Sequence, residues 1–227
     1  MVKYEDYAWT FDNEEVVKEF DTHVRQSVPL YDSFHTMVVN MSKYAIQDNT
    51  KVVDIGCSTG HLLKSLNEVS KKENVEFVGL DVSESMINFC KANHEMTFIN
   101  TNAIDFNFDN SSFVTSILCF QFCKKEERRK IIQSVYSGLK EDGMLVIVEK
   151  VKSEVIDVHD IFNDLYYDFK REQGLTDKEI IDKNVSLRGV MKPMTVEENL
   201  AFLKDVGFTK IDLFFKYNNF VGIVAIK

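Results

Sequence analysis

Short apolar runs alternate with amphipathic segments through the middle of the chain, between Lys51 and Lys150. The runs are rich in β-branched residues, whereas the segments between them carry apolar residues at helical spacing. This alternation is typical of a parallel sheet whose strands are connected by helices. It predicts strands at residues 51–55, 75–80, 96–99, 112–120 and 144–148, and helices at 59–70, 83–93 and 124–140.

The pattern changes after residue 150. A long amphipathic segment at 155–173 is followed by Gly174, which is a typical signal for the C-terminal end of a helix. Two Thr-x-x-Glu segments have the spacing of a capping box and predict further helices that start after Thr176 and Thr195. The chain closes with two apolar runs that a short polar segment should join as a hairpin: 211–215, 217–219 and 221–227.

Two more helices are predicted before the sheet, at 13–27 and 31–44, with Pro29 between them. Open α/β sheets bind ligands at the carboxyl ends of their strands. We therefore expect these two helices to cover that edge as a cap. The pattern as a whole predicts an α/β fold in three parts: a helical cap at 1–45, a ligand-binding core at 46–150, and substrate-side helices with the terminal hairpin at 151–227.

The composition narrows the class of protein. The 227 residues carry a formal net charge of −9, from 27 basic and 36 acidic side chains, so we expect no direct binding of nucleic acid. The basic run at 124–130 should then be a solvated helix face.

No apolar run is long enough to span a bilayer, and residues 1–10 are too polar for a signal peptide, which favours a cytoplasmic protein without a membrane partner. The four cysteines lack metal-ligand spacing, so we expect reduced thiols and no metal site.

The strongest local motif is the segment 54–60, Asp-Ile-Gly-Cys-Ser-Thr-Gly, which follows the first predicted strand and starts a helix. Its glycines, Gly56 and Gly60, permit a sharp turn and the close approach of a ligand. A dinucleotide fingerprint has a second glycine two residues after the first, where the pyrophosphate contacts the backbone, but here that position is Ser58. Asp54 stands just before the loop, where its carboxylate would repel a phosphate and attract a cation.

Asp81 ends the second predicted strand and is placed to accept hydrogen bonds from ribose hydroxyls. Together with Asp54, it favours an adenosine ligand that has a positive tail without phosphates. S-adenosylmethionine (SAM) has this chemistry. A tight turn without a ligand and a nicotinamide-dependent enzyme are the alternatives that the motif leaves open.

These motifs resemble those of a known family. The loop at 54–60, Asp81 in LDVS, Asn102 in NAIDF and the strand LKEDGMLVIVE together resemble the class I SAM-dependent methyltransferases. That resemblance implies a Rossmann-like fold with a seven-stranded, mostly parallel sheet, a C-terminal antiparallel hairpin and an N-terminal helical cap.

The flanking segments resemble one branch of the family more specifically, the carboxy-S-adenosylmethionine synthases, whose product serves the modification of wobble uridines in tRNA. The resemblance extends from about Trp9 to Lys227. The segments that carry it are FDTHVRQSVPLY at 20–31, Gln121-Phe122, Glu149-Lys150, YYDFKREQG at 166–174 and the terminal YNNFVGIVAIK.

The resemblance implies which residues surround the cofactor, and two positions depart from the branch. Asn184 stands where the branch has an arginine that holds the cofactor's extra carboxylate, and Ile117 stands where it has an asparagine. The extra carboxylate of the cofactor then lacks the guanidinium group that would bind both of its oxygens, so we do not expect it to be bound. Arg188 lies four residues beyond Asn184 and is the other arginine that could reach this space. The cofactor-binding residues expected by position are Tyr31, Gly56, Cys57, Ser58, Asp81, Val82, Asn102 and Ala103, to which the electrostatic argument adds Asp54.

Tyr166 and Tyr167 lie on the long predicted helix, where proteins of this fold place substrate residues. Successive helix positions diverge, so we expect one ring to face the pocket while the other packs in the core. An aromatic face stabilises a sulfonium by a cation–π interaction of up to about 2 kcal/mol when it is desolvated. With Asn184 these tyrosines form the candidate catalytic set, and Glu149 is a candidate base or an orienting partner of Lys150.

Two smaller questions concern histidines and phenylalanines. His23 and His35 fall in the predicted cap, from which they could reach the pocket, although surface or hydrogen-bonded histidines are the more frequent case.

The resemblance also implies a homodimer that associates through the late helices and the hairpin. The candidate contacts for that dimer are Phe214, Phe215 and Phe220.

A sulfonium makes its attached carbons electrophilic, so catalysis requires a nucleophile placed in line in a dry pocket rather than an activated protein nucleophile. The first hypothesis is therefore methyl transfer from SAM to a small molecule enclosed beneath the cap. The second is an enzyme that uses SAM itself as a substrate, by carboxyl transfer to its methyl group or by a cyclisation that releases methylthioadenosine. The third is a protein that binds SAM without turnover.

Overall fold

A seven-stranded sheet lies at the centre of the residues that the computed structural model describes, 14–227. Its strand order is β3-β2-β1-β4-β5-β7-β6, and β7 is antiparallel to both of its neighbours while the other adjacent pairs are parallel. The strands are β1 (Lys51–Ile55), β2 (Glu76–Asp81), β3 (Thr97–Asn100), β4 (Ser111–Ile117), β5 (Leu139–Lys150), β6 (Lys210–Tyr217) and β7 (Phe220–Ile226). The predicted α/β fold with a terminal hairpin is confirmed.

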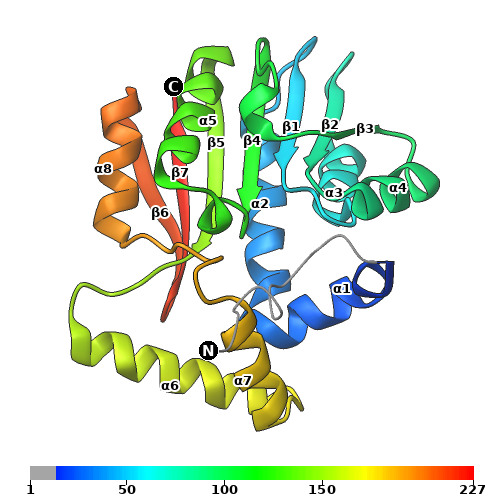
Figure 1. The fold of residues 1–227 in the computed structure, drawn as a ribbon. Helices are drawn as coiled ribbons and strands as arrows, with labels where there is room; N and C mark the ends of the chain where they lie inside the picture. Colours follow the sequence, from blue (N-terminus) through cyan, green and yellow to red (C-terminus); the bar gives the residue numbers. More distant parts are fainter. Residues whose placement is uncertain (1–13) are drawn as a thin grey trace.

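Helices cover both faces of the sheet and its carboxyl edge. In Figure 1, α1, α6 and α7 lie beneath the ends toward which the parallel strands point. The helices of the described residues are α1 (Glu14–Ser27), α2 (Tyr31–Ala45), α3 (His61–Val69), α4 (Glu84–Asn93), α5 (Lys125–Gly138), α6 (Ile156–Glu172), α7 (Asp177–Ser186) and α8 (Val196–Val206), together with the short 3-10 helices η2 (Ala103–Asp105) and η3 (Phe120–Phe122). The predicted start at residue 13 and the segment 1–10 lie outside the described residues.

The alternation of side chains along the strands produces two cores. Val53 and Ile55 of β1 pack on one face with α5 and α8, whereas Val52 packs on the other face with α2, α3 and α4. The same division separates Leu145 from Val146 in β5. Each such side chain is almost fully buried, which contributes about 1.5–3 kcal/mol apiece. The sheet is therefore fixed between two helical layers, and its carboxyl edge is left for the site.

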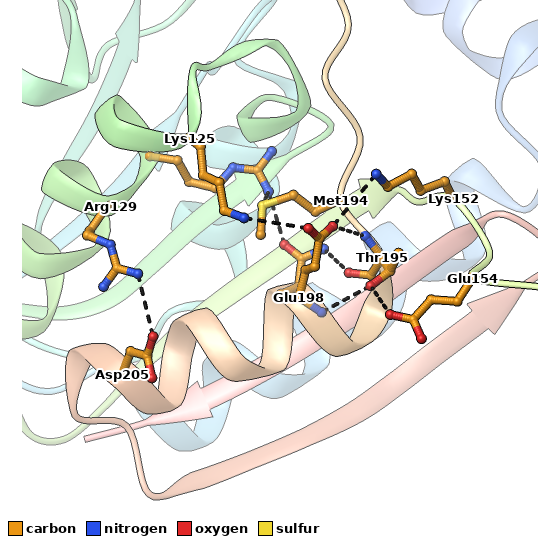
Figure 2. Close-up of polar contacts among 10 residues, drawn as sticks. Lys125, Arg129, Lys152, Glu154, Met194, Thr195, Glu198 and Asp205 are labelled. Atoms are coloured by element: carbon orange, nitrogen blue, oxygen red, sulfur yellow. Dashed lines mark hydrogen bonds and ion pairs between the residues drawn. The ribbon is translucent and has the colours of Figure 1, made fainter.

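Polar contacts fix α8 against α5. The predicted capping box is present, since Thr195 accepts the amide N–H of Glu198 and the Glu198 carboxylate accepts that of Thr195. Figure 2 shows that the Glu198 side chain also lies beside Lys125 and Lys152, at 3.5 Å and 3.9 Å. These ion pairs are partly exposed and contribute at most about 1 kcal/mol each. Their effect is mainly to place the segment that leads from α7 into α8.

Two predicted strand boundaries are wrong. β4 ends at Ile117 instead of residue 120, because Leu118 adopts the left-handed conformation (φ 56°), which breaks the strand. β5 begins at Leu139 instead of residue 144, because the chain leaves α5 at Gly138 and pairs at once with Ser111 of β4. The first change places the turn after β4 directly beside the ligand-binding edge.

The phenylalanines of the hairpin do not form an exposed surface. Phe215 and Phe220 are buried within the protein, in a cluster that includes Phe34 of α2 and Val148 of β5. Phe214 packs partly against the same cluster. A dimer that uses Phe215 and Phe220 as contacts is therefore not compatible with this packing. Within residues 14–227, no helix combines the length and the apolar character needed to cross a membrane.

Candidate functional site

A cavity of about 630 Å³ lies at the carboxyl edge of the sheet. Its size falls within the range of about 300–1,000 Å³ that is usual for pockets that enclose drug-sized ligands. Residues of α1, α6 and α7 line the cavity. The second helix expected in the cap, α2, reaches the cavity only with Tyr31 and His35 and otherwise packs on a face of the sheet, so α1 alone covers the edge as expected for the cap. The sequence-predicted residues that line it are Tyr31, Asp54, Gly56, Cys57, Ser58, Asp81, Val82, Asn102, Ala103, Ile117 and Tyr166.

The loop after β1 is held in a conformation that needs left-handed backbone at three positions. Gly56 and Gly60 have φ values of 72° and 76°, and Ser58 between them has a φ of 44°, which is unusual for a residue with a side chain. The amides of Gly56 and Cys57 donate to the carbonyl of Leu80 in β2, at 2.8 Å and 2.9 Å. A Cβ atom on Gly56 would lie 2.6 Å from the Cys119 sulfur. The loop is therefore tied to the sheet and fills the space beneath it.

Asp54 is a buried carboxylate that accepts a hydrogen bond from the Thr115 hydroxyl at 2.7 Å. Burial raises the pKa of Asp54 to about 7, the negative charge of Asp81 adds to the increase, and the hydrogen bond from Thr115 opposes it. A carboxylate whose charged form is disfavoured by desolvation is stabilised by a neighbouring cation. The position thus suits a positively charged ligand and not a phosphate.

Asp81 is the last residue of β2, and Asn102 follows β3, so both lie at the carboxyl edge of the sheet. The two oxygens of Asp81 accept the amide N–H groups of Ser58 at 3.0 Å and of Ser83 at 2.9 Å. Asn102 accepts the amide N–H of Ile104 at 3.1 Å and so starts η2. Both side chains are thereby oriented at the cavity wall. The proposed contact of Asp81 with ribose hydroxyls and that of Asn102 with the cofactor remain predictions.

A side-chain hydrogen bond connects the cap to the loop, and histidines of α1 and α2 line the cavity. The Thr59 hydroxyl donates to the Asp21 carboxylate of α1 at 2.8 Å. His35 stacks on Tyr31 with ring centroids 4.2 Å apart, and its Nε2 has no hydrogen-bond partner among the described residues. Burial lowers the pKa of His35 to about 3, and the nearby His61 lowers it further. His35 is therefore a neutral, buried imidazole that packs against Tyr31 in the lining of the cavity.

The candidate catalytic residues are divided between two cavities. Tyr166 lines both the main cavity and a smaller one of about 230 Å³. Tyr167 and Asn184 line only the smaller cavity, where the Asn184 amide donates to the Tyr167 hydroxyl at 2.9 Å. The expectation that the second tyrosine packs in the core is wrong, because α7 provides it with a polar partner at the surface. Arg188 lines the same smaller cavity.

Glu149 does not act on Lys150 in the way that the sequence suggested. Its carboxylate is fully buried, pairs with Arg128 at 3.1 Å and accepts the amide N–H of Gln121 at 3.1 Å. Burial raises the pKa of Glu149 to about 7, and the Arg128 charge opposes this increase. The basic run at 124–130 was predicted to be a solvated helix face. Arg128 departs from this prediction, because its side chain is buried in the core.

Three lysines lie beside the cavity, and the sequence reasoning named only Lys150 among them, as a partner of Glu149. Lys150 and Lys183 line both cavities, and Lys170 lines the smaller one. The Nζ atoms of Lys150 and Lys170 lie 4.0 Å and 4.5 Å from the ring centroid of Tyr166. Burial lowers the pKa of Lys150 to about 7 and that of Lys170 to about 8. The signal that could have identified Lys150 is its position at the end of β5, beside the other strand ends.

The cysteines of the site are paired with one another as thiols. A hydrogen bond with Cys123, followed by burial, raises the pKa of the Cys119 thiol, and a hydrogen bond with Cys90 does the same for Cys57. All four cysteines are free. Within residues 14–227, no group of three or more His, Cys, Asp or Glu side chains is arranged to hold a metal ion.

Comparisons with known proteins agree with this geometry. A family model described as a methyltransferase domain matches residues 52–143. A carboxy-S-adenosyl-L-methionine synthase of Staphylococcus epidermidis is 42% identical over 229 residues, covering 100% of this chain and 100% of the relative. Another from Methylococcus capsulatus is 36% identical, covering 94% of this chain and 92% of the relative.

Solved structures share the fold at low identity. The plantazolicin methyltransferase BpumL, solved with a triazolic desmethylPZN analog and SAH, has a TM-score of 0.68 at 15% identity and covers 96% of this chain and 92% of its own. Phosphoethanolamine N-methyltransferase 2 of Haemonchus contortus, solved with S-adenosyl-L-methionine, has a TM-score of 0.68 at 14% identity and covers 100% of this chain and 60% of its own.

The chain therefore belongs to the class I SAM-dependent methyltransferases, and it is a SAM-dependent transferase with SAM as its cofactor or substrate. Within that class its full-length relatives are the proteins named carboxy-S-adenosyl-L-methionine synthase. Both levels of the resemblance that the sequence motifs indicated are confirmed.

Proposed function

We propose that the protein transfers the methyl group of SAM to a small molecule held in the same enclosed cavity. The observation that carries this proposal is the shape of the main cavity. One side is formed by the loop after β1 and the ends of β2 and β4, and the other side is formed by α1, α6 and α7. A cavity of about 630 Å³ between the sheet edge and these helices has room for a small molecule beside the cofactor.

The residues present fit SAM as a ligand. The buried Asp54 carboxylate favours a nearby cation, and Asp81 is an acceptor held by two backbone amides at the edge of the same cavity. When bound, SAM supplies an electrophilic methyl group next to a positively charged sulfur. Asp54, Gly56, Cys57, Ser58, Asp81, Val82, Asn102, Ala103 and Tyr31 are the residues that we propose to surround it.

The chain's own contribution to catalysis is placement and exclusion of water. α1 covers the cavity, and the Thr59–Asp21 hydrogen bond holds this cap against the loop. The Tyr166 ring lies at the junction of the two cavities, where an aromatic face can stabilise positive charge. In-line placement in a dry pocket provides about 7–11 kcal/mol of the barrier reduction in favourable cases. Such a mechanism needs no activated protein nucleophile.

Product analysis tests the proposal. The purified protein is incubated with SAM and pools of small-molecule metabolites, and the nucleoside products are identified by mass spectrometry. We expect S-adenosylhomocysteine together with a methylated small molecule. Methylthioadenosine would instead show attack on the aminobutyryl carbon, including cyclisation of SAM. If SAM binds but no product forms with any of the metabolite pools, the protein binds SAM without turnover, and this result would contradict an enzymatic role.

A second candidate function is carboxyl transfer to the methyl group of SAM. The specific observation in its favour is that relatives of 30–42% identity over nearly the whole chain are named carboxy-S-adenosyl-L-methionine synthase. The same incubation with prephenate as the carboxyl donor distinguishes it, because a carboxylated SAM adduct would form in place of S-adenosylhomocysteine. The expected loss of carboxylate binding through Asn184 argues against this candidate.

The remaining expectations concern the setting of the enzyme. We propose that it works in the cytoplasm on a small molecule, without direct binding of nucleic acid or membrane. The net charge of −9 supports the absence of a nucleic acid partner. A homodimer remains a prediction from the family resemblance, with contacts other than the buried Phe215 and Phe220.

A further inference from the structure

Two of the four cysteines lie at the ends of one short turn beside the main cavity. Cys119 precedes η3 and Cys123 follows it. The Cys119 carbonyl accepts the amide N–H of Phe122 at 3.0 Å, and the Cys123 amide donates to the Phe120 carbonyl at 2.9 Å. This turn folds the chain back, so that the two thiol groups form a hydrogen bond with each other. The sulfur atoms that a disulfide would join are therefore already in contact.

The same two thiols can be reached from the cavity. Cys119 and Cys123 both line it and are only partly buried. The other two cysteines differ, since Cys57 is 4% exposed and Cys90 is 0% exposed. The Cys90 thiol also donates to the Ser58 carbonyl at 3.0 Å. A small oxidant that enters the cavity therefore meets the thiols of Cys119 and Cys123 more readily than the other pair.

The two thiols differ in acidity. The hydrogen bond with Cys119 lowers the pKa of the Cys123 thiol, while burial and the charge of Glu149 oppose this change and the charge of Arg128 adds to it. The same hydrogen bond, followed by burial, raises the pKa of Cys119. The thiolate is the nucleophilic form of cysteine. Cys123 is therefore the group that reacts first with an oxidant, and Cys119 is the thiol placed to resolve the product.

We propose that Cys119 and Cys123 are a site of reversible oxidation, at which hydrogen peroxide closes a disulfide that weakens the binding of SAM. In the first step the Cys123 thiolate attacks one oxygen of the peroxide, the O–O bond breaks, and a sulfenic acid forms while hydroxide leaves. In the second step the Cys119 sulfur attacks the Cys123 sulfur, and the S–O bond breaks as a second hydroxide leaves. Each hydroxide takes up one thiol proton, so two thiols are oxidised to a disulfide and the peroxide is reduced to two water molecules.

The backbone of the turn is anchored on both sides, so it does not move freely to accommodate the new bond. The Gln121 amide donates to the buried Glu149 carboxylate at 3.1 Å, and the Gln121 side chain accepts the amide N–H of Lys150 at 2.7 Å. The buried Arg128 guanidinium donates to the Phe120 carbonyl. Since a disulfide requires the two sulfurs to approach to about 2.05 Å, the movement falls mainly on the two cysteine side chains.

Cys119 connects this movement to the loop that we propose to surround SAM. A Cβ atom on Gly56 would lie 2.6 Å from the Cys119 sulfur and 2.8 Å from its Cβ atom, so the thiol packs directly against the loop. A sulfur that moves toward Cys123 removes these contacts. Ser58 in the same loop has a φ of 44°, a conformation that persists only where the surrounding structure fixes it. The loop should then populate other conformations, and SAM affinity should decrease.

This inference rests on the proposed position of SAM and not on the identity of its partner. It therefore applies whether SAM donates its methyl group or is itself the substrate.

Reversible oxidation of the full-length protein tests the proposal. The reduced protein is treated with an equimolar amount of hydrogen peroxide, the remaining thiols are alkylated, and the disulfide is located by mass spectrometry of a digest made without reductant. Calorimetry measures the SAM affinity of the reduced protein, of the oxidised protein and of the oxidised protein after treatment with dithiothreitol. The same measurements are made on Cys123→Ser and on the control Cys90→Ser, which breaks the other thiol pair and keeps a hydroxyl donor for the Ser58 carbonyl.

We expect a disulfide between Cys119 and Cys123, and a decrease in SAM affinity of about fivefold or more, which corresponds to about 1 kcal/mol. Dithiothreitol should restore the affinity. Cys90→Ser should respond as the unmodified protein does, whereas peroxide should leave the SAM affinity of Cys123→Ser at the value that this variant has before treatment.

The proposal is overturned if peroxide forms no disulfide, if it joins Cys57 to Cys90 instead, or if the expected disulfide leaves SAM affinity unchanged. A folded Cys123→Ser variant that loses affinity as the unmodified protein does would also contradict it. If this variant does not fold, the recovery of the unmodified protein with dithiothreitol still decides the question. Failure of the proposed SAM site has a different signature, because the reduced protein would then not bind SAM, and both proposals would be removed.

Discussion

Asp54 illustrates how one buried group links the chemistry of the cavity to the stability of the protein. Its carboxyl is almost completely buried and has a pKa raised to about 7. The folded protein therefore holds a proton on Asp54 at pH values where the unfolded chain, with an ordinary pKa of 3.8, has lost it. Stability due to this group is complete below about pH 4 and decreases as the pH rises toward 7.

Replacing Asp54 with asparagine should remove this pH dependence. Asparagine keeps an acceptor for the Thr115 hydroxyl but cannot be charged. Without ligand, we expect Asp54→Asn to be more stable than the unmodified protein at pH 8, by up to about 4 kcal/mol, and the difference should fall to about 1–2 kcal/mol at pH 5. Urea denaturation at both pH values measures the difference. SAM affinity should decrease by about tenfold or more at pH 8, since the cation loses its carboxylate.

Asp109→Asn provides the control, because Asp109 is an exposed carboxylate outside the cavity. It should alter neither the pH dependence nor SAM binding. Equal stability of Asp54→Asn and the unmodified protein at pH 8, together with equal SAM affinity, would contradict the role of Asp54 as an uncompensated buried carboxylate.

The residues of the loop were predictable individually, whereas the cluster of lysines beside the cavity was not. Asp54, Gly56 and Asp81 lie in short motifs whose chemistry can be derived from spacing. Lys150, Lys170 and Lys183 are separated along the chain, and each resembles an ordinary solvated lysine in its own segment. Only the folding of β5, α6 and α7 to one edge brings them together. Arg128 was misinterpreted for the same reason, since its partner Glu149 lies on another element.

At the scale of elements, the central strands and their helices were predicted because their apolar periodicity is strong. The extents of β4 and β5 were not, because a single left-handed residue, Leu118, and an early pairing at Leu139 decide them. Neither feature produces a periodic signal. Capping boxes, by contrast, located the starts of α7 and α8 correctly, since the residues that form them are adjacent in sequence.

The contact between α1 and the loop gives a second test at this scale. Thr59 of the loop donates to Asp21 of the cap at 2.8 Å, and both belong to segments that cover the cavity. We expect Asp21→Ala to increase the dissociation rate of SAM by about three- to tenfold, as the loss of a hydrogen bond of about 1 kcal/mol predicts. The association rate should change less. Stopped-flow displacement measures both rates.

A double-mutant cycle isolates the interaction. Thr59→Val removes the hydroxyl with little change in shape, and the double variant Asp21→Ala/Thr59→Val should release SAM no faster than either single variant. Additive effects of the two changes would show that each acts through a different contact, and the cap would then not be held by this hydrogen bond.

At the scale of the whole molecule, the cavity is closed by segments that are distant in sequence. α1, the loop after β1, and α6 with α7 all contribute to one ligand-enclosing wall. A ligand that contacts all of them binds only the folded state, because the unfolded chain does not bring these segments together. Binding and global stability are therefore linked.

SAM at a concentration of 100 times its dissociation constant should stabilise the protein by about 2.7 kcal/mol. For a chain of this length, that corresponds to an increase in melting temperature of about 5–10 °C. Differential scanning calorimetry measures the shift, and NAD at the same concentration is the comparison. A larger shift with NAD than with SAM would contradict the assignment of the loop to a phosphate-free cationic ligand.

The close approach of Gly56 and Cys119 makes two distant positions depend on each other. The sulfur of Cys119 occupies the space that any Cβ atom at position 56 would need. A smaller residue can therefore replace Cys119 without a clash. A bulkier residue at position 119 would displace the loop after β1 from the sheet. Natural variation faces the same asymmetry, because position 119 can become smaller while Gly56 is kept but cannot become larger without displacement of the loop.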